Sequence, residues 1–214
     1  MISICVIAFG LSLFFVAASS RIDAYINAII LQGILLTVIM LENHLHHLTI
    51  VNFIFIILET VIFKIIIIPY FLMKIIRDNK ISRETEPYIP QFFSILIVSV
   101  IFVFGFSLAY WSIENTDNIK PFSFGIAIST IISALFIIVS RKKLITHMIA
   151  YVIVENGIFL LSLSTAREFP IIVNLGILLD AFLLVLISGL FISKVKTRFE
   201  DEQIDNLRIL KEDD

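Results

Sequence analysis

The sequence predicts an all-α membrane protein with about seven transmembrane helices, for three reasons. Hydrophobic residues make up 59% of the 214 residues and the mean hydropathy is +1.02, values that exclude a soluble domain. The apolar residues form runs long enough to cross a hydrocarbon core of about 30 Å. Lys and Arg concentrate between those runs rather than inside them. The runs cover residues 2–19, 24–41, 50–74, 91–111, 122–140, 144–164 and 171–193.

The first, second, fourth and fifth runs contain no charged residue, so we expect them to form packing and lipid-facing helices. The first run has no basic segment before it and only a poor cleavage site at Ala17-Ala18, so it is interpreted as a retained helix. Pro90 directly precedes the fourth run and suits a first helical turn, where a missing N–H has no partner to lose. The third, sixth and seventh runs carry ionisable residues and are therefore the candidate working helices.

The basic residues predict the orientation of the chain. With seven spans, thirteen Lys and Arg residues fall on one side of the membrane, whereas only Lys120 and Arg167 fall on the other. Because positively charged loops remain in the cytoplasm, the N-terminus is predicted outside and the C-terminus inside. The thirteen are Arg21, Lys74, Arg77, Lys80, Arg83, Arg141, Lys142, Lys143, Lys194, Lys196, Arg198, Arg208 and Lys211.

The longest polar connection between the runs suggests how the chain is organised. It separates an N-terminal three-helix part (1–76) from a C-terminal four-helix part (91–193), with a cytoplasmic loop (77–90) between them. A charged cytoplasmic tail (194–214) follows. Its alternating charges and few apolar residues fit either a helix that docks a partner or a simply solvated segment.

Four charged residues lie deep inside the apolar runs, where a charge costs at least a few kcal/mol unless it faces protein or water. Their depth is calculated as the number of residues from the nearest basic cluster on the predicted cytoplasmic side, multiplied by the helical rise of about 1.5 Å per residue. Glu155 lies about 18 Å deep, Asp180 about 21 Å and Glu59 about 22 Å. Lys64 lies about 15 Å deep. All four are therefore predicted near the middle of the membrane, as in a lateral path for protons or ions.

The local pattern around Glu59 and Lys64 leaves two interpretations open. The two residues are five apart, about 140° around an α-helix, and so do not form an ideal pair within one helix. Pro69 removes a helical hydrogen bond, and the predicted kink would bring Lys64 toward a polar neighbour. Either Lys64 holds a charge that responds to its carboxylate partner, or the pair only neutralises itself for packing.

The sixth run predicts a polar track. His147, Tyr151 and Glu155 are spaced i, i+4 and i+8 and share one helical face, leading from the basic surface to a central carboxylate. The alternative places His147 among lipid headgroups and Tyr151 in ring packing, and for His147 alone this alternative is favoured. In the seventh run Asn174 precedes Asp180, which is interpreted as a transient proton site. The alternative is that Asp180 is a neutral acid in a helix-to-helix hydrogen bond.

Other chemistry finds little support in the sequence. The single cysteine, Cys5, excludes a disulfide framework and a Cys-ligated metal or iron–sulfur centre, so we expect no cofactor and no catalytic site in this chain. The His-rich segment 42–47 offers zinc or copper ligands, but a solvated loop is favoured because no further ligand lies at a familiar spacing. No basic stripe indicates a nucleic-acid partner.

Three segments carry a resemblance to a known family. Phe63–Pro69, Val154–Phe159 and Pro170 with Leu175–Asp180 together resemble hydrogenase 4 component E, over essentially the whole chain. That family belongs to the membrane arm of energy-converting group 4 nickel–iron hydrogenases and formate hydrogenlyases. The last three runs (122–193) also look like the K-type subunit of complex I and the C subunit of multisubunit Na⁺/H⁺ antiporters.

The resemblance implies a non-catalytic membrane subunit in a bacterial or archaeal cytoplasmic membrane. Its neighbours would be antiporter-like and K-type or H-type-like membrane subunits, with a hydrogenase or related oxidoreductase arm on the cytoplasmic side. In the K-type subunit two glutamates on successive helices serve the proton path, and they match Glu155 and Asp180. Redox chemistry elsewhere would then drive protons or Na⁺ past these residues and Glu59–Lys64. A stand-alone secondary transporter or channel, and a scaffold without an ion path, remain the alternatives.

Overall fold

The computed structural model describes residues 2–44, 58–78, 87–113 and 120–165, together with Phe182, Leu186 and Gly189. Every element in this part of the chain is a helix, which confirms the predicted all-α class. The predicted seventh run lies outside the described residues apart from the last three named, which are helical. The number of seven spans and the orientation of the chain stay predictions.

The described helices correspond to the first six predicted runs, and their ends differ from the predicted ones mostly by a few residues. Four helices, α2, α5, α6 and α7, are long and apolar enough to cross a membrane, and α1 is a shorter apolar helix. The third run divides into a π-helix and an α-helix that follow each other without a break. The elements are α1 (Ile2–Ala18), α2 (Ile22–His44), η1 (Leu58–Ile67), α4 (Ile68–Asp78), α5 (Gln91–Ile113), α6 (Pro121–Ser140) and α7 (Leu144–Thr165).

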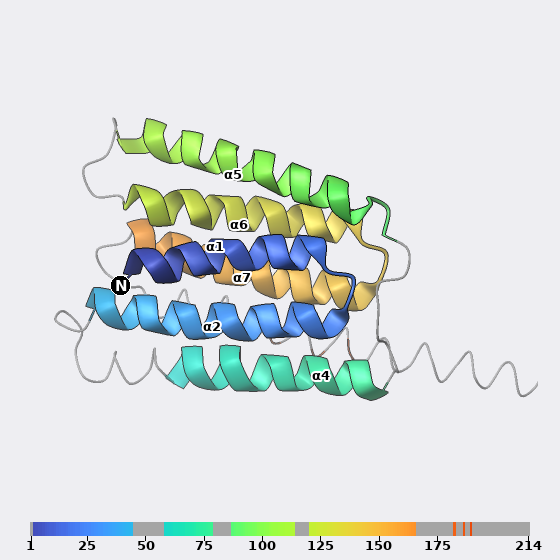
Figure 1. Cartoon of the computed structure of the whole chain (residues 1–214). Coiled ribbons are helices and arrows are strands. Elements are labelled where there is room, and N and C mark those ends of the chain that lie inside the picture. Colours follow the sequence, from blue (N-terminus) through green and yellow to red (C-terminus); the bar gives the residue numbers. More distant parts are fainter. Residues whose placement is uncertain are drawn as a thin grey trace, which may run out of the picture.

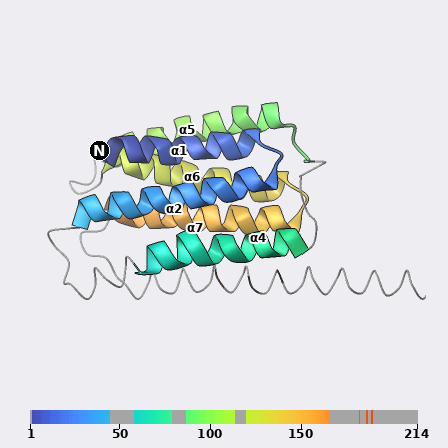
Figure 2. The same ribbon diagram turned by 60° about the horizontal axis from the view of Figure 1, so that its bottom comes forward.

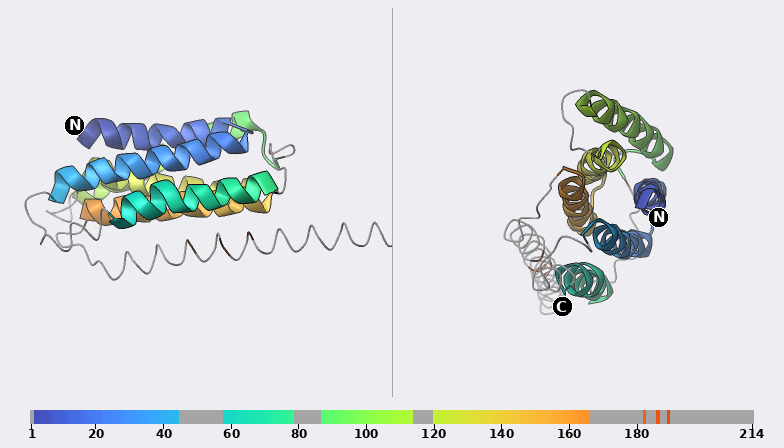
Figure 3. Two further views of the ribbon diagram at one scale, coloured as in Figure 1. Left: turned by 90° about the horizontal axis from the view of Figure 1, so that it is seen from below. Right: turned by 90° about the vertical axis from the view of Figure 1, so that its left-hand side faces the viewer.

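The helices lie side by side in one bundle (Figure 1). η1 continues into α4 as one rod, and otherwise consecutive helices run in opposite directions. Figure 2 and the end-on view in Figure 3 agree, with α5 on one side of the bundle and α4 on the opposite side. Between them, α2 packs against α1, η1, α4 and α7, and α7 packs against α6. The interface between α2, η1 and α7 is therefore an interior position.

One apolar core joins the parts that the sequence separates. Buried side chains of the N-terminal helices, such as Val16, Ile29 and Leu72, cluster with Ile137 and Ile149 of α6 and α7. Between membrane-spanning helices such contacts stabilise the bundle through van der Waals packing, because lipid tails are as apolar as these side chains. This cluster therefore includes residues from both sides of the polar loop before α5.

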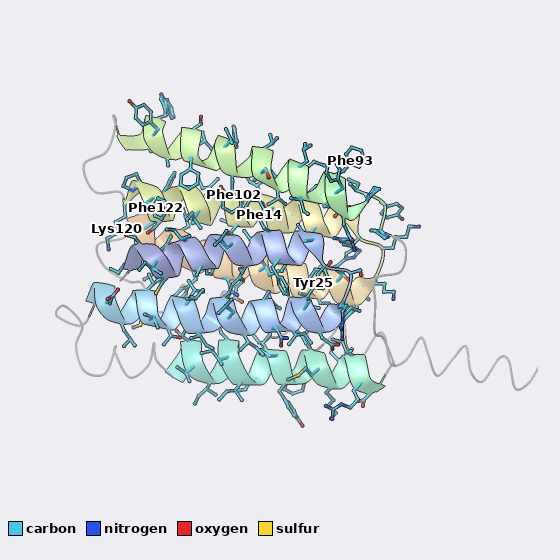
Figure 4. The ribbon with its side chains drawn as sticks, in the orientation of Figure 1. Phe14, Tyr25, Phe93, Phe102, Lys120 and Phe122 are labelled. Carbon is cyan, nitrogen blue, oxygen red and sulfur yellow. The ribbon has the colours of Figure 1, made fainter. Side chains whose placement is uncertain are left out.

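The outer face of α5 has the character of a lipid-facing surface. Three of its side chains are about two-thirds exposed or more, namely Phe92, Val103 and Trp111. Figure 4 shows α5 at the margin of the bundle, with Phe93 labelled beside it. Phe92 and Trp111 mark the two ends of the helix about 28 Å apart, close to the thickness of a hydrocarbon core. Aromatic residues at both ends of an apolar helix are typical of membrane–water interfaces.

The π-helix η1 ends directly before the turn that contains Pro69. In an α-helix interior a proline ring clashes with the carbonyl four residues earlier, which here is that of Ile65. The 140° expected between Glu59 and Lys64 assumed an α-helix and does not apply here. On α2, Gly33 lets the backbones approach, because a Cβ atom there would lie 3.0 Å from Cγ1 of Ile65. Together these features place Lys64 against the bundle interior.

Candidate functional site

The centre of the described bundle holds a buried ion pair. Nζ of Lys64 on η1 lies 3.0 Å from Oε1 of Glu155 on α7. Lys64 is 1% exposed and Glu155 2%. The sequence predicted Lys64 and Glu155 at similar depths in the membrane. The carboxylate that contacts Lys64 lies on α7, a different helix from that of Lys64. The charged residues of α2 and α4 lie toward the ends of those helices, at Asp23, Glu42, Lys74, Arg77 and Asp78.

The ammonium group of Lys64 has two further neighbours on α7. It donates to Oδ1 of Asn156 at 3.5 Å, and it lies 4.3 Å from the centroid of the Phe159 ring. A cation above an aromatic face gains about 2 kcal/mol when the site is desolvated. Lys64 is therefore held by a carboxylate, an amide oxygen and an aromatic ring from one helix.

A chain of hydrogen bonds extends from this pair across the bundle. Nδ2 of Asn156 donates to Oε1 of Gln32 on α2 at 3.2 Å, and Nε2 of Gln32 donates to Oγ of Ser12 on α1 at 2.8 Å. The hydroxyl of Ser12 donates to the carbonyl oxygen of Phe9 at 2.6 Å. All three polar side chains are buried. The chain therefore links η1, α7, α2 and α1 through hydrogen bonds that lie away from solvent, where each is electrostatically stronger than in water.

Glu155 is only half satisfied within the described part of the structure. Its Oε1 meets Lys64, whereas its buried Oε2 has no hydrogen-bond partner there. On α6, the helix that packs against α7, Oγ of Ser133 is likewise buried without a partner among the described residues. An unpartnered carboxylate oxygen in a dry interior is costly as an anion and becomes a donor when protonated. Oε2 of Glu155 is therefore the open hydrogen-bonding position of the pair among the described residues.

The structure brings only some of the predicted site residues together. Lys64 and Glu155 meet, and Tyr151 is half-buried on the same helix as Glu155. Nε2 of His147 lies 2.8 Å from the carbonyl oxygen of Arg141, so its ring is engaged at the turn between α6 and α7. Outside the described residues lie Asp180, Asn174, the side chain of Glu59 and most of the His-rich segment. No group of residues suited to hold a metal ion occurs among those that are described.

Arg141 is buried, although its place in a basic cluster suggested a surface residue. It is 1% exposed and donates through Nη2 to the carbonyl oxygen of Ala17 at 3.2 Å. Its backbone N–H also bonds the carbonyl oxygen of Ile137, which closes the end of α6. A cation at the carbonyl end of a helix is favoured by the helix dipole. Arg141 therefore ties the end of α6 to the end of α1.

The two ends of the bundle differ in charge. The turns α1–α2 and α6–α7 and the end of α4 lie at one end (Figure 1), and these segments carry most of the described basic residues. Lys120, labelled in Figure 4, lies at the opposite end, where its N–H donates to the carbonyl oxygen of Ser164. Loss of hydration at the start of α6 lowers the pKa of the Lys120 side chain. Most of the described basic residues therefore lie at one end of the bundle.

Sequence reasoning missed three members of the polar chain. Ser12 and Gln32 lie in runs that carry no charge, and Asn156 was noted only as part of a motif. A search for charged residues in apolar runs passes over them, because an amide or a hydroxyl disturbs hydropathy less. Gln32 was nevertheless visible as a single large polar side chain in the middle of the second run.

Comparison with known proteins gives distant relatives. The chain is 22% identical over 150 residues to the uncharacterized protein Rv0085 of Mycobacterium tuberculosis, covering 70% of this chain and 68% of the relative. It is also 22% identical over 149 residues to hydrogenase-4 component E of Escherichia coli, covering 69% and 68%. The same values hold for hydrogenase-4 component E of Shigella flexneri. No protein-family profile and no solved structure matches the chain.

These relatives agree with the resemblance expected from the motifs around Lys64, Glu155 and Asp180. The similarity spans most of both chains, but its identity is low, so it supports a relationship between families rather than a shared activity. The chain is thus an all-helical membrane protein with a distant, family-level relationship to hydrogenase-4 component E.

Proposed function

We propose that this chain is an integral subunit of an energy-converting membrane complex similar to group 4 hydrogenases. In this proposal the Lys64–Glu155 pair is part of a lateral path for protons or Na⁺, which Asp180 and Glu59 extend. The observation that carries the proposal is the buried pair itself, with one carboxylate oxygen left unpartnered among the described residues. The distant relationship to hydrogenase-4 component E supplies the class of complex.

The physical argument begins with the cost of the pair. Moving two charges out of water costs several kcal/mol per ion, and well-packed apolar side chains often stabilise a core as well or better. A buried ion pair is therefore weak evidence for stability. Within a membrane such residues usually mark ion or proton paths. Lys64 and Glu155 fit this pattern because they are central in the predicted spans and inside the bundle.

The chemistry follows from the charges. A proton that reaches Oε2 of Glu155 neutralises the carboxylate and weakens its attraction for the ammonium of Lys64. Loss of that proton restores the attraction. Each transfer therefore changes the electric field at the next titratable group, which is how redox chemistry in another subunit would drive ions along a row of such groups. A Na⁺ ion at Glu155 would change the same field.

The remaining parts of the proposal concern place and partners. The basic end of the bundle would face the cytoplasm of a bacterial or archaeal cell, with the N-terminus outside and the C-terminus inside. Antiporter-like and K-type or H-type-like subunits would pack against the exposed faces within the membrane. A hydrogenase or related oxidoreductase arm would bind on the cytoplasmic side.

Purification of the whole complex tests the class of protein. A tag placed after Asp214 should isolate this chain in mild detergent together with iron–sulfur proteins and large antiporter-like membrane chains. A control purification from cells that carry the untagged chain identifies proteins that bind the resin on their own. Isolation of the chain by itself, with ion transport retained in vesicles, would contradict the proposal and support a stand-alone transporter.

A further inference from the structure

The direction of each hydrogen bond in the polar chain follows from the chemistry of Lys64. An ammonium group has three donors and no acceptor, so Asn156 must turn Oδ1 toward it. This leaves Nδ2 of Asn156 to donate to Oε1 of Gln32. Gln32 in turn presents Nε2 to Oγ of Ser12. Every amide therefore points its oxygen toward Lys64 and its nitrogen toward α1.

The far end of the chain fixes this direction. The hydroxyl of Ser12 donates to the backbone carbonyl of Phe9, which cannot rotate because it belongs to α1. The hydroxyl hydrogen is thus occupied, and its oxygen remains free to accept from Gln32. With both ends fixed, a flip of either amide would place two donors or two acceptors against each other. Such a mismatch in a buried site costs the full desolvation of the unpaired groups.

We propose that Asn156, Gln32 and Ser12 are positioning residues that keep the ammonium of Lys64 charged and in place while Glu155 gains and loses a proton. The inference rests on the proposed ion path and says which member of the pair changes its charge. When a proton binds Oε2 of Glu155, Lys64 loses its ionic partner. The amide oxygen of Asn156 and the ring of Phe159 remain to hold the cation.

The same chain sets a limit to the path. An amide N–H does not pass on a proton without first forming a high-energy protonated or imidic form, so Asn156 and Gln32 conduct no protons toward α1. In this proposal the proton is bound and released at Glu155 alone. Its Oε2–H bond forms when the proton arrives and breaks when the proton leaves. The path therefore leaves the pair from Oε2 rather than through α2 and α1.

Infrared difference spectroscopy of the intact complex in vesicles tests this inference. The carbonyl stretch of a protonated carboxylic acid is recorded while the pH is varied, and the part of the signal that disappears in Glu155→Gln is assigned to Glu155. We expect Asn156→Leu to lose most of that signal at the pH where the wild-type complex shows half of it. Without the amide oxygen, protonation of Glu155 leaves the cation with too few partners.

Variants farther along the chain separate positioning from packing. Gln32→Met keeps the size of the side chain but leaves Nδ2 of Asn156 without its acceptor. Asn156 is then held less firmly against Lys64, so the Glu155 signal should weaken, and Asn156→Leu combined with Gln32→Met should add no further loss. Ser129→Ala is the matched control, because its buried hydroxyl bonds to its own helix, at Gly125.

Two outcomes would contradict the inference. One is a Glu155 signal that stays at the wild-type level in both Asn156→Leu and Gln32→Met. The other is a signal that falls equally in Ser129→Ala. Failure of the proposed function has a different signature, since ion translocation would then continue in Glu155→Gln while the signal still responded to Asn156 and Gln32.

Discussion

At the residue scale, Lys64 and Glu155 are tolerable in the interior only because each has the other. Their contact at 3.0 Å offsets part of the desolvation cost of both groups, and both are almost fully buried in the described bundle. The surroundings are unequal, however. Lys64 has Asn156 and Phe159 as further neighbours, whereas Oε2 of Glu155 has none among the described residues. Within the described bundle the carboxylate is therefore the less fully partnered member of the pair.

This inequality predicts an asymmetric response to mutation. Lys64→Met should destabilise the folded chain by roughly 3–5 kcal/mol when Glu155 stays ionised, because it leaves a buried charge without a partner. Glu155→Gln should be milder, since the cation keeps its amide and its ring. Lys64→Met combined with Glu155→Met should recover most of the stability. The measurement is the thermal unfolding of each variant in detergent. A double variant as unstable as the sum of the single ones would show that the pair is not coupled.

At the element scale, close approaches between helix backbones decide where the site residues lie. A Cβ atom at Gly157 would lie 2.9 Å from Cγ1 and 3.2 Å from the backbone nitrogen of Ile131, so α7 touches α6 two residues beyond Glu155. On the other side, Gly33 of α2 admits the backbone of η1 at Lys64. The π-helix turns Lys64 inward, and these two glycines set the spacing of the helices on either side.

Gly157→Ala should therefore lower stability, by about 1–3 kcal/mol, because the backbone of α6 must move to admit the methyl group. Gly10→Ala is a matched control on α1, since a Cβ atom there meets only side chains, the nearest at 3.2 Å. The control should lower the midpoint of thermal unfolding less than Gly157→Ala does. Equal midpoints for the two variants would contradict the close contact between α6 and α7.

The helices could be predicted from the sequence better than the contacts between them. Apolar runs predicted the described helices, and helical rise predicted that Lys64 and Glu155 lie at similar depth. Depth says nothing about rotation or neighbours, so the partner of Lys64 and the π-helix before Pro69 could not be read from spacing. Arg141 was counted only as one of the basic residues on one side, because burial of its guanidinium depends on the end of α1. Gln32 and Asn156 were missed because the search followed charge.

At the scale of the whole molecule, the described helices have exposed apolar side chains along their length and basic residues mainly at one end, as is typical of membrane proteins. The turns at the basic end are held together by Arg141 on Ala17 and by the N–H of Tyr88 on the carbonyl of Ser140. The apolar face of α5 lies on the outside of the bundle. A partner subunit or lipid would cover this face, while the ion pair remains inside.

The orientation predicts the location of both ends of the chain. A reporter that is active only in the cytoplasm should give a signal when it is fused after Asp214 and none when it is fused after Asp117. The reason is the unequal distribution of Lys and Arg between the two sides. A reporter active only outside the cytoplasm is the control and should show the opposite pattern. Activity of the cytoplasmic reporter after Asp117 would overturn the orientation and the depths measured from it.

The central claim is that the Lys64–Glu155 pair belongs to an ion path coupled to redox chemistry. The most direct test is the number of ions translocated per electron transferred by the whole complex in vesicles. Glu155→Gln keeps the size of the side chain and its hydrogen bonding but removes the exchangeable acid. We expect electron transfer to continue while translocation falls strongly, and we expect the same of Asp180→Asn, with the double variant little worse because both acids serve one path. Wild-type translocation per electron in both single variants would contradict the account and leave these acids as packing residues.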